Sequence, residues 1–499
     1  MASARVFAAV DLGAESGRVV TGRVDGGSVA LEVVHRFANR PLWLPDGRHW
    51  NLPQLFSETL EGLARTGAAG RLDGIGVDSW GVDYALLDGG HRMLGLPFHY
   101  RDERVTDGVV ARAHELVPRE ELYARTGIQT MPINTVYQLM AERGSGAAAA
   151  SEAIALVPDL INLWLTGELA NEATNASTTG LLEATGRGWA IDLIARLCIP
   201  ERPFTGEVLP PGRRLGSVLD RYGEQRGTPV YAVASHDTAS AFVGTPLGGP
   251  AEAVLSSGTW SLLGLEVPQP VLGGDAAAFN LTNERGFDDT VRLLRNVMGL
   301  WLVQECRRAW RNAGRDLDYD ELHTAAREAH AEVPLLDPDQ PSLLRGGDMP
   351  TLIASACAAA GQPAPADPGA VIRSILVSLA CKYRLVLEQL QLVSGRRVEV
   401  VHVVGGGVRN ELLCQLTADV LGVPVLAGPE EATALGNVMV QARACGELSS
   451  LADMRELVAR SVQVERYEPS GTGPANDETY SRFLSVTGLQ AGRPARVAA

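Results

Sequence analysis

Two segments about half a chain apart share one pattern, and this repetition limits the fold more than any other feature of the sequence. Residues 6–22 (VFAAVDLGAESGRVVTG) and 252–266 (EAVLSSGTWSLLGLE) each run from an apolar stretch through small, hydroxyl-bearing and glycine residues into a second apolar stretch. This pattern is typical of two strands joined by a glycine turn. Since 499 residues are too many for one hydrophobic core, it favours two related halves that meet near residues 244–250. So short a likeness also arises by coincidence.

Apolar periodicity predicts a mixed α/β chain. Strand-like runs alternate with a helical pattern that begins near Leu52 and stops at about Gly67, which indicates a mixed or parallel sheet flanked by helices. We expect an N-terminal domain over residues 1–246, a C-terminal domain over 247–468 and a polar, partly disordered tail over 469–499. Stretches rich in Pro, Gly and small residues predict loops at residues 143–152, 201–216, 336–350 and 361–370.

Composition restricts the cellular location and the kinds of partner that we expect for this protein. The early apolar run VFAAV is too short for a signal peptide, and no stretch approaches the roughly 18 to 20 uncharged apolar residues of a membrane span. We therefore expect a cytoplasmic protein without a membrane partner, as a monomer or a weak homodimer. A formal net charge of −15 without a basic block argues against nucleic acid as a partner. The six cysteines lack metal-ligand spacing, so we expect them to be buried as small apolar side chains.

Lysine is almost absent, and this restricts how the protein can handle phosphate. Of the 44 basic residues only Lys382 is a lysine, a bias that a GC-rich genome also explains. Lys382 lies within an apolar helical pattern, and the sequence contains no GxxxxGK[ST], which excludes a P-loop NTPase. A phosphate site in this chain must use backbone N–H groups, hydroxyls, arginine and a metal ion.

Three glycine turns are candidates for such a site. In DLGAESGR (11–18), successive N–H groups can hold an anion, Asp11 can hold Mg²⁺ through water, and Arg18 can meet a phosphate oxygen. LSSGTWS (255–261) offers a second turn without a carboxylate, and the two turns could grip a polyphosphate from both sides. Gly405–Gly407 follow a β-branched run and precede a helix, which suits a close approach of the backbone to a nucleotide. Each segment also fits an ordinary tight turn, and none matches the dinucleotide fingerprint.

The stretch SHDTASAFVG (235–244) places an acid where a strand ends and a helix begins. Asp237 can cap that helix, or it can act as a general base on a substrate hydroxyl, and the two roles can coexist. His236 is either a packed ring or a substrate ligand. The position in the sequence alone does not decide between these roles.

Taken in order, these motifs resemble those of the FGGY carbohydrate kinases of the actin-like ATPase superfamily. The resemblance covers residues 6 to about 445, and WGVDYALLD, TNASTTG and NVMGLWLVQE are particular to its rhamnulokinase branch. It implies an α/β fold of two ribonuclease-H-like domains, with mixed sheets flanked by helices and the active site in the interdomain cleft. It also implies ATP-dependent phosphorylation of L-rhamnulose at its first-carbon hydroxyl, with Mg²⁺, in L-rhamnose catabolism.

The resemblance further assigns roles to individual residues. Asp237 matches the family's proton acceptor and Asp11 its metal-associated aspartate. The implied sugar contacts are Gly81, His236, Asp237, Thr238 and Asn296. The implied nucleotide contacts are Ala14, Glu15, Ser16, Gly17, Arg18, Thr259, Gln304 and one of Gly405–Gly407, for which we expect Gly406. Many kinases of the wider family have Ser or Thr at the position of Glu15, so we expect no direct phosphate contact from this carboxylate.

Other functions stay open on the sequence alone. The nearest is a kinase for L-fuculose or another ketose, which would differ only in the sugar pocket around Trp80, Gly81, His236 and Asn296. A sugar sensor that binds ATP without phosphoryl transfer is disfavoured by the intact aspartates. A nicotinamide-dependent dehydrogenase lacks its fingerprint.

Overall fold

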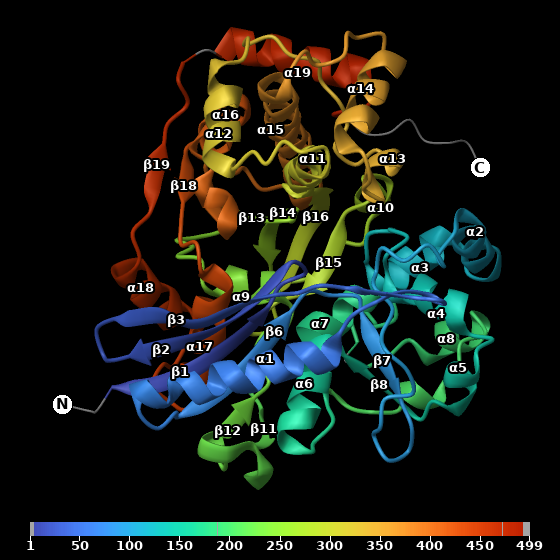
Figure 1. Ribbon diagram of the computed structural model, residues 1–499, viewed down its shortest axis with the longest axis vertical. Helices are drawn as coiled ribbons and strands as arrows, with labels where there is room; N and C mark the ends of the chain where they lie inside the picture. The colour runs from blue at the N-terminus through green and yellow to red at the C-terminus, as the bar shows by residue number, and fades with distance from the viewer. Residues whose placement is uncertain (1–3, 187, 472, 493–499) are drawn as a thin grey trace.

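Two mixed sheets, one in each half of the chain, form the frame of the protein. The computed structural model describes residues 4–186, 188–471 and 473–492. A six-stranded sheet has the order β11-β12-β6-β1-β2-β3, and a seven-stranded sheet has the order β15-β16-β14-β13-β17-β18-β19. In Figure 1 the first sheet lies in the lower part of the molecule, and the second rises from its centre into the upper part. The α/β fold with mixed sheets that the sequence predicts is confirmed.

The first sheet is built around a hairpin. β1 pairs antiparallel with β2 and parallel with β6, and β2 continues into β3. Its strands are β1 (Arg5–Leu12), β2 (Ser16–Val24), β3 (Val29–Ala38), β6 (Gly74–Ser79), β11 (Arg214–Ser217) and β12 (Pro229–Tyr231). The side chains of β1 and β6 are almost all buried, as expected for strands covered on both faces.

The second sheet repeats this arrangement. β13 pairs antiparallel with β14 and parallel with β17, and β14 pairs antiparallel with β16. Its strands are β13 (Glu252–Ser257), β14 (Trp260–Val267), β15 (Thr282–Arg285), β16 (Val291–Met298), β17 (Val400–Val404), β18 (Val425–Ala427) and β19 (Glu465–Tyr467). The two similar sequence segments are therefore the central hairpins of two similar sheets.

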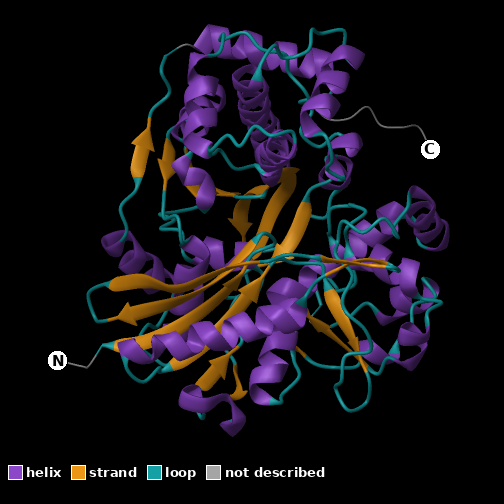
Figure 2. Cartoon of the chain, in the orientation of Figure 1, coloured by secondary structure: helices purple, strands orange, loops and turns teal. Residues whose placement is uncertain are grey.

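Helices cover both sheets (Figure 2). In the first half, α1 packs on β2 and β3, and α6 packs on β6. The helices of this half are α1 (Leu52–Arg65), α2 (Asp107–Leu116), α3 (Arg119–Thr126), α4 (Thr135–Glu142), α5 (Gly146–Ala150), α6 (Val157–Thr166), α7 (Ala173–Ala176), α8 (Ile191–Arg196) and α9 (Asp237–Val243). Short strand pairs complete it, namely β4 (Leu42–Leu44) with β5 (Gly47–His49), β7 (Tyr84–Leu87) with β8 (Ala153–Leu156), and β9 (Asn171–Glu172) with β10 (Val208–Leu209).

In the second half the long helix α15 packs on β14 and β16, and α16 packs on α15. The helix α17 instead packs on α9 and on β1 of the first half, so the two halves meet along these elements. The helices of this half are α10 (Gly274–Ala278), α11 (Trp301–Asn312), α12 (Tyr319–Glu328), α13 (Pro341–Leu344), α14 (Met349–Ala359), α15 (Pro368–Ser394), α16 (Glu411–Leu421), α17 (Ala432–Ala444), α18 (Leu451–Ser461) and α19 (Gly473–Thr487).

Three expectations differ from the structure. The predicted polar tail contains α19, which lies across the top of the molecule in Figure 1 and buries Phe483 against the second half. Residues 472 and 493–499 of that tail lie outside the described residues. Four cysteines are buried, but Cys445 is half-buried and Cys198 is exposed at the end of α8. The stretches predicted as loops hold short elements, because Ala-rich and Pro-initiated turns suffice for α5 and α13.

Among the described helices, none combines the length and the apolarity that crossing a bilayer requires.

Candidate active site

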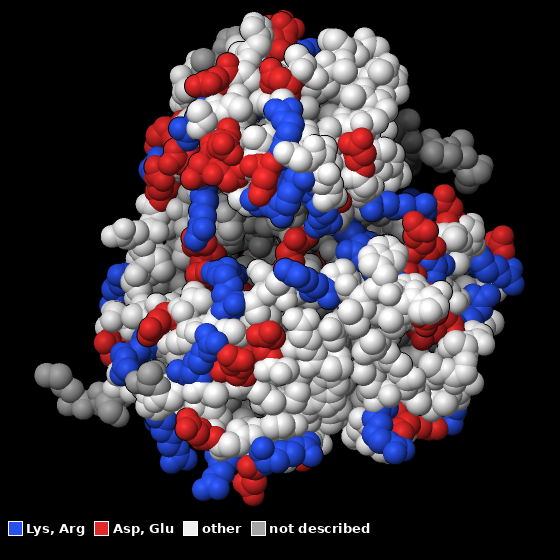
Figure 3. Space-filling model, viewed as in Figure 1, with Lys and Arg blue, Asp and Glu red and all other residues white. Residues whose placement is uncertain are grey.

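A cavity of about 820 Å³ is lined by residues of both halves. Figure 3 shows the molecule hollowed between its upper and lower parts, with charged side chains around the opening. Nearly all the site residues expected from the sequence line this cavity, although they come from distant parts of the chain. They are Asp11, Ala14, Glu15, Ser16, Arg18, Gly81, His236, Asp237, Thr238, Thr259, Asn296, Gln304 and Gly406.

Gly17 is the exception. A Cβ atom on Gly17 would lie 2.3 Å from the ring of Phe37 on the neighbouring strand β3, so this glycine permits close packing within the sheet. Side chains alternate along a strand, and Gly17 stands on the face opposite to its neighbours Ser16 and Arg18, both of which line the cavity.

The β1–β2 turn carries a buried ion pair. Asp11 is the last residue but one of β1, is 4% exposed and lies opposite Arg18 in the strand register. Arg18 Nη2 is 2.6 Å from Asp11 Oδ2, and Arg18 Nε is 2.9 Å from Glu431 Oε2 just before α17. The turn closes through Gly13 N–H, which donates to the Ser16 carbonyl at 3.0 Å. Arg18 thus stands between two carboxylates at the wall of the cavity.

A second buried carboxylate lies beside Asp11. Asp78 of β6 is its neighbour in the parallel register, and Asp78 Oδ2 accepts a hydrogen bond from Asn437 Nδ2 at 2.5 Å. Burial raises the pKa of the Asp78 carboxyl well above its usual value, and the charge of Asp11 raises it further. The sequence analysis did not single out Asp78, because the pairing of β1 with β6 is visible only in the fold.

Asp237 is the first residue of α9. A backbone bond from Ser79 N–H to the Ser235 carbonyl, at 2.9 Å, joins the preceding segment to the end of β6. Asp237 Oδ1 accepts hydrogen bonds from Thr238 N at 2.5 Å and Thr238 Oγ1 at 3.1 Å. Its side chain is 31% exposed, in the cavity wall. Burial raises the pKa of Asp237, the adjacent His236 opposes that rise and the charge of Asp11 adds to it. The N-cap position of α9 falls on His236, whose side chain makes no capping hydrogen bond, so Asp237 is not the helix cap that the sequence allowed. Its carboxylate accepts hydrogen bonds within the first turn of α9 and faces the cavity.

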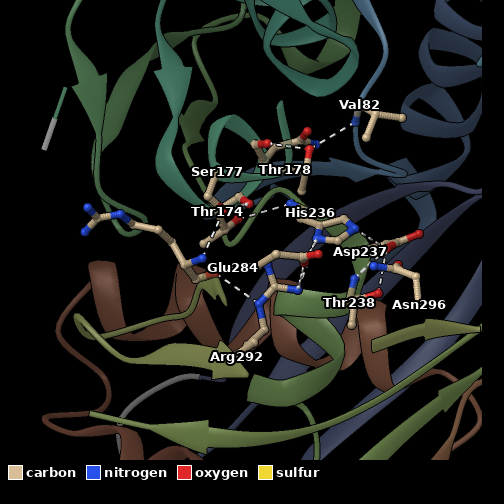
Figure 4. A network of polar contacts seen from close by, with 12 residues as sticks. Val82, Thr174, Ser177, Thr178, His236, Asp237, Thr238, Glu284, Arg292 and Asn296 are labelled. Atoms are coloured by element: carbon tan, nitrogen blue, oxygen red, sulfur yellow. Dashed lines mark hydrogen bonds and ion pairs between the residues drawn. The ribbon is translucent and has the colours of Figure 1, made fainter. Parts of the chain in front are cut away.

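His236 and Asn296 lie within one polar network (Figure 4). His236 Nε2 is 3.4 Å from Asp237 Oδ1, and His236 Nδ1 faces Glu284 and Arg292 of the second sheet. Asn296 Nδ2 donates to Gln129 Oε1 at 3.1 Å, which links β16 to the first half. Both predicted sugar ligands are thus held by contacts between the two halves.

The glycine turns of the second half line the same cavity as the β1–β2 turn. Gly258 N–H donates to the Trp260 carbonyl at 2.8 Å and closes the β13–β14 turn, just as the bond from Gly13 to Ser16 closes the β1–β2 turn. Gly405 has φ of +83°, and a Cβ atom on Gly407 would lie 2.0 Å from Ser257 Oγ, so both are needed for the backbone path. A Cβ atom on Gly406 would meet no atom within 4 Å, and both Gly405 and Gly406 line the cavity. That Gly406 is the glycine nearest a nucleotide stays a prediction.

Glu15 lies on the cavity wall but has a partner across it. Its side chain is 42% exposed, and Glu15 Oε1 is 3.6 Å from Arg308 Nη2 of α11. Some cavity residues of both halves were not predicted as site residues, although Thr178 lies within TNASTTG and Arg409 and Asn410 closely follow the three glycines. They include Gln129, Met131, Thr178, Glu284, Tyr319, His323, Arg409 and Asn410.

The residues near Asp11 suit a divalent cation that keeps most of its water. Both contacts from Arg18 fall on Asp11 Oδ2, and Oδ1 accepts no hydrogen bond from the described part of the chain. Within the same residues, no group of three or more His, Cys, Asp or Glu side chains could hold a metal ion. A cation bound through one carboxylate, water and phosphate oxygens is the usual arrangement for Mg²⁺ with nucleotides.

Comparison with known proteins agrees with this geometry. The N-terminal domain model of the FGGY family of carbohydrate kinases matches residues 6–244, and the C-terminal domain model matches residues 253–445. The rhamnulokinase of Bacteroides thetaiotaomicron is 38% identical over 96% of this chain and 98% of its own length. The rhamnulokinase of Pectobacterium atrosepticum is 41% identical over 92% of both chains. These relatives confirm the resemblance that the motifs indicate.

Solved kinase structures share the fold of this protein. The crystal structure of gluconate kinase from Lactobacillus acidophilus superimposes with a TM-score of 0.79 over 98% of this chain and 99% of its own, at 15% identity. That likeness confirms the actin-like ATPase fold of two domains. Matched by both family models and by relatives along nearly its whole length, the chain belongs to the FGGY family of carbohydrate kinases.

Proposed function

We propose that the protein transfers the γ-phosphoryl group of ATP to the first-carbon hydroxyl of L-rhamnulose, with Mg²⁺ and with Asp237 as general base. The products are L-rhamnulose 1-phosphate and ADP. The choice of sugar is supported by relatives that bear the name rhamnulokinase at 38% and 41% identity. The chemistry is supported by one observation above all. Asp237 presents a carboxylate of raised pKa to a cavity that all three glycine turns also line.

The reaction needs a proton acceptor only late. As the sugar oxygen bonds to phosphorus and the bond to the β-phosphate oxygen breaks, the sugar hydroxyl becomes acidic and its proton passes to Asp237. The hydrogen bonds from Thr238 hold the carboxylate at the start of α9. His236 and Asn296 would orient the sugar, and water would be kept out when the halves close.

Backbone N–H groups and an arginine would bind the phosphate groups of ATP. The N–H groups of the turns around Ala14 and Thr259 would hold phosphate oxygens, with Arg18 nearby. Mg²⁺, when bound, would neutralise phosphate charge, and Asp11 would hold it through water. The lone lysine takes no part, because Lys382 Nζ is 1% exposed and pairs with Asp337 at 2.8 Å and Asp339 at 3.0 Å.

A coupled ADP-release assay with Mg-ATP tests the proposal. We expect L-rhamnulose to give a higher kcat/KM than L-fuculose, D-xylulose, L-ribulose and glycerol, with phosphate on the first carbon by NMR. We expect chelation with EDTA to stop turnover and added Mg²⁺ to restore it. A higher kcat/KM with L-fuculose would favour the alternative ketose, and a higher value with glycerol or a pentulose would refute the assignment.

The location and the assembly stay predictions. A cytoplasmic monomer or weak homodimer is what the sequence favours. Light scattering during size-exclusion chromatography of the full chain tests the assembly.

A further inference from the structure

The ring of His236 is held from the other half of the molecule by a buried ion pair. Glu284 of β15 and Arg292 of β16 lie directly opposite each other in the antiparallel register, and they are 3% and 0% exposed. Arg292 Nη1 is 3.0 Å from Glu284 Oε2. His236 Nδ1 is 3.0 Å from Arg292 Nη1 and 3.2 Å from Glu284 Oε2. One ring nitrogen is therefore fully engaged by this pair.

The other ring nitrogen, Nε2, is therefore the one that faces the cavity and the proposed base. With Nδ1 turned to the ion pair, Nε2 points to Asp237 Oδ1 at 3.4 Å, and His236 lines the cavity (Figure 4). The backbone is fixed too, since His236 N–H donates to Thr174 Oγ1 at 3.1 Å. A rotation of the ring would break the contacts on Nδ1 and would remove Nε2 from the cavity wall.

The side chain of Asn296, the second predicted sugar ligand, helps to lower the pKa of Glu284, while its Nδ2 donates to Gln129 Oε1 at 3.1 Å. Burial alone would raise the pKa of Glu284, but the charge of Arg292, the bond from His236 and the Asn296 side chain hold it below its usual value. An ionised carboxylate only accepts hydrogen bonds, so Glu284 can hold the Nδ1 side of the His236 ring in place.

Stability is a poor explanation for this pair. Two charges buried in a sheet lose their hydration, and apolar side chains of similar volume often stabilise a protein equally well or better. What apolar residues cannot supply is a directed contact to the imidazole.

We propose that Glu284 and Arg292 are positioning residues for sugar binding, which fix the His236 ring from the second half of the molecule. This inference rests on the proposed function only in taking this end of the cavity as the sugar site.

Substitution of the carboxylate gives the main test. We expect Glu284→Gln to raise the KM for the sugar about 10- to 100-fold, because a hydrogen bond to a charged group is lost at a ligand. The KM for ATP should change less than about 2-fold. In a His236→Gln background, Glu284→Gln should add much less, since Glu284 acts largely through that ring.

A double variant separates positioning from folding. Glu284→Gln leaves the Arg292 charge buried without its partner, whereas Glu284→Gln with Arg292→Gln removes both charges. We expect the double variant to regain stability in urea relative to the single variant, while its sugar KM stays raised. A merely structural pair would recover both properties together.

The chain supplies a matched control. His402 Nε2 is 2.8 Å from Glu252 Oε2, the imidazole is 2% exposed, and neither residue lines the cavity. We expect Glu252→Gln to leave the KM values for sugar and ATP unchanged, whatever it does to stability.

Ring nitrogen signals give a readout that does not depend on activity. The protein has nine histidines, and the ¹⁵N signals of the His236 ring are identified by their loss in His236→Gln. We expect Glu284→Gln to shift these signals more than those of any other histidine ring. Unchanged His236 signals together with an unchanged sugar KM would overturn the inference. The kinetic test uses whichever ketose the wild type prefers, so a preference for another sugar would refute the proposed substrate and leave this test intact. If no sugar is phosphorylated, the ring signals alone decide.

Discussion

At Asp237, one carboxylate both anchors the start of α9 and faces the cavity, and a single substitution separates the two roles. In the wild type, Thr238 N–H donates to Asp237 Oδ1 at 2.5 Å. Asp237→Asn keeps an oxygen that can accept this hydrogen bond, so we expect the free energy of unfolding to change by less than about 1 kcal/mol. The amide cannot accept the sugar proton, so we expect turnover to fall by at least about 100-fold. Urea denaturation and the ADP-release assay check both values. Near-normal turnover would leave Asp237 with a structural role alone.

The same carboxylate predicts the acid side of the pH profile. A general base must be ionised, and burial raises the pKa of Asp237. We therefore expect kcat/KM for the sugar to fall about tenfold per pH unit below that raised pKa, and the midpoint to lie above the value of about 4 of an ordinary aspartate. A pH series on the wild type measures this midpoint. The residual activity of Asp237→Asn should not show this fall at low pH. A midpoint at or below about 4 would contradict the prediction.

Individual residues differ in how far the sequence predicts them. Asp11, His236 and Asp237 stand in short motifs at strand ends, so their place in the cavity follows from local pattern and resemblance. Asp78 pairs with Asp11 of a strand that is distant in sequence, whereas Glu284 lies opposite Arg292 on the next strand, and its contact with His236 of the other half is visible only in the fold.

Among the elements, strands were easier to predict than the last helix. The β1–β2 and β13–β14 hairpins carry apolar runs on both sides of glycine turns, which local sequence shows directly. α19 was missed because its sequence is polar overall, and a lone helix of this length is marginal in water. Its apolar residues gain burial only against distant parts of the chain, namely α15, α16 and the segment around Leu335.

Phe483 tests the contribution of α19. Its side chain is 0% exposed and packs with Leu335, Val377 and Leu385. We expect Phe483→Ala to lower the free energy of unfolding by about 3 to 5 kcal/mol. Ser485→Ala, on the exposed face of the same helix, should change it by less than about 0.5 kcal/mol. Urea denaturation measures both, and equal effects would show that α19 does not contribute to the core.

On the scale of the whole molecule, the halves meet where α9 and α17 cross. α9 begins at Asp237, and α17 begins just after Glu431, the partner of Arg18 beside the β1–β2 turn. The crossing therefore helps to set the distance between the proposed base and the β1–β2 turn. The sequence predicts two halves from their similar hairpins, but it does not show which helices join them.

Glycines permit this crossing, and Gly436 gives the last test. A Cβ atom on Gly436 would lie 1.8 Å from the carbonyl oxygen of Ser240, and one on Gly244 would lie 2.1 Å from that of Ala432. Because backbone atoms block the space, Gly436→Ala must displace α9 relative to α17. We expect a loss of about 1 to 3 kcal/mol in the free energy of unfolding. Since α9 carries Asp237, we also expect kcat to fall by at least about 10-fold at temperatures where the variant stays folded. The control is Gly249→Ala, where a Cβ atom would meet nothing within 4 Å, and it should leave kcat unchanged. An unchanged kcat in a destabilised Gly436→Ala would mean that the crossing holds the halves together without setting the position of the base.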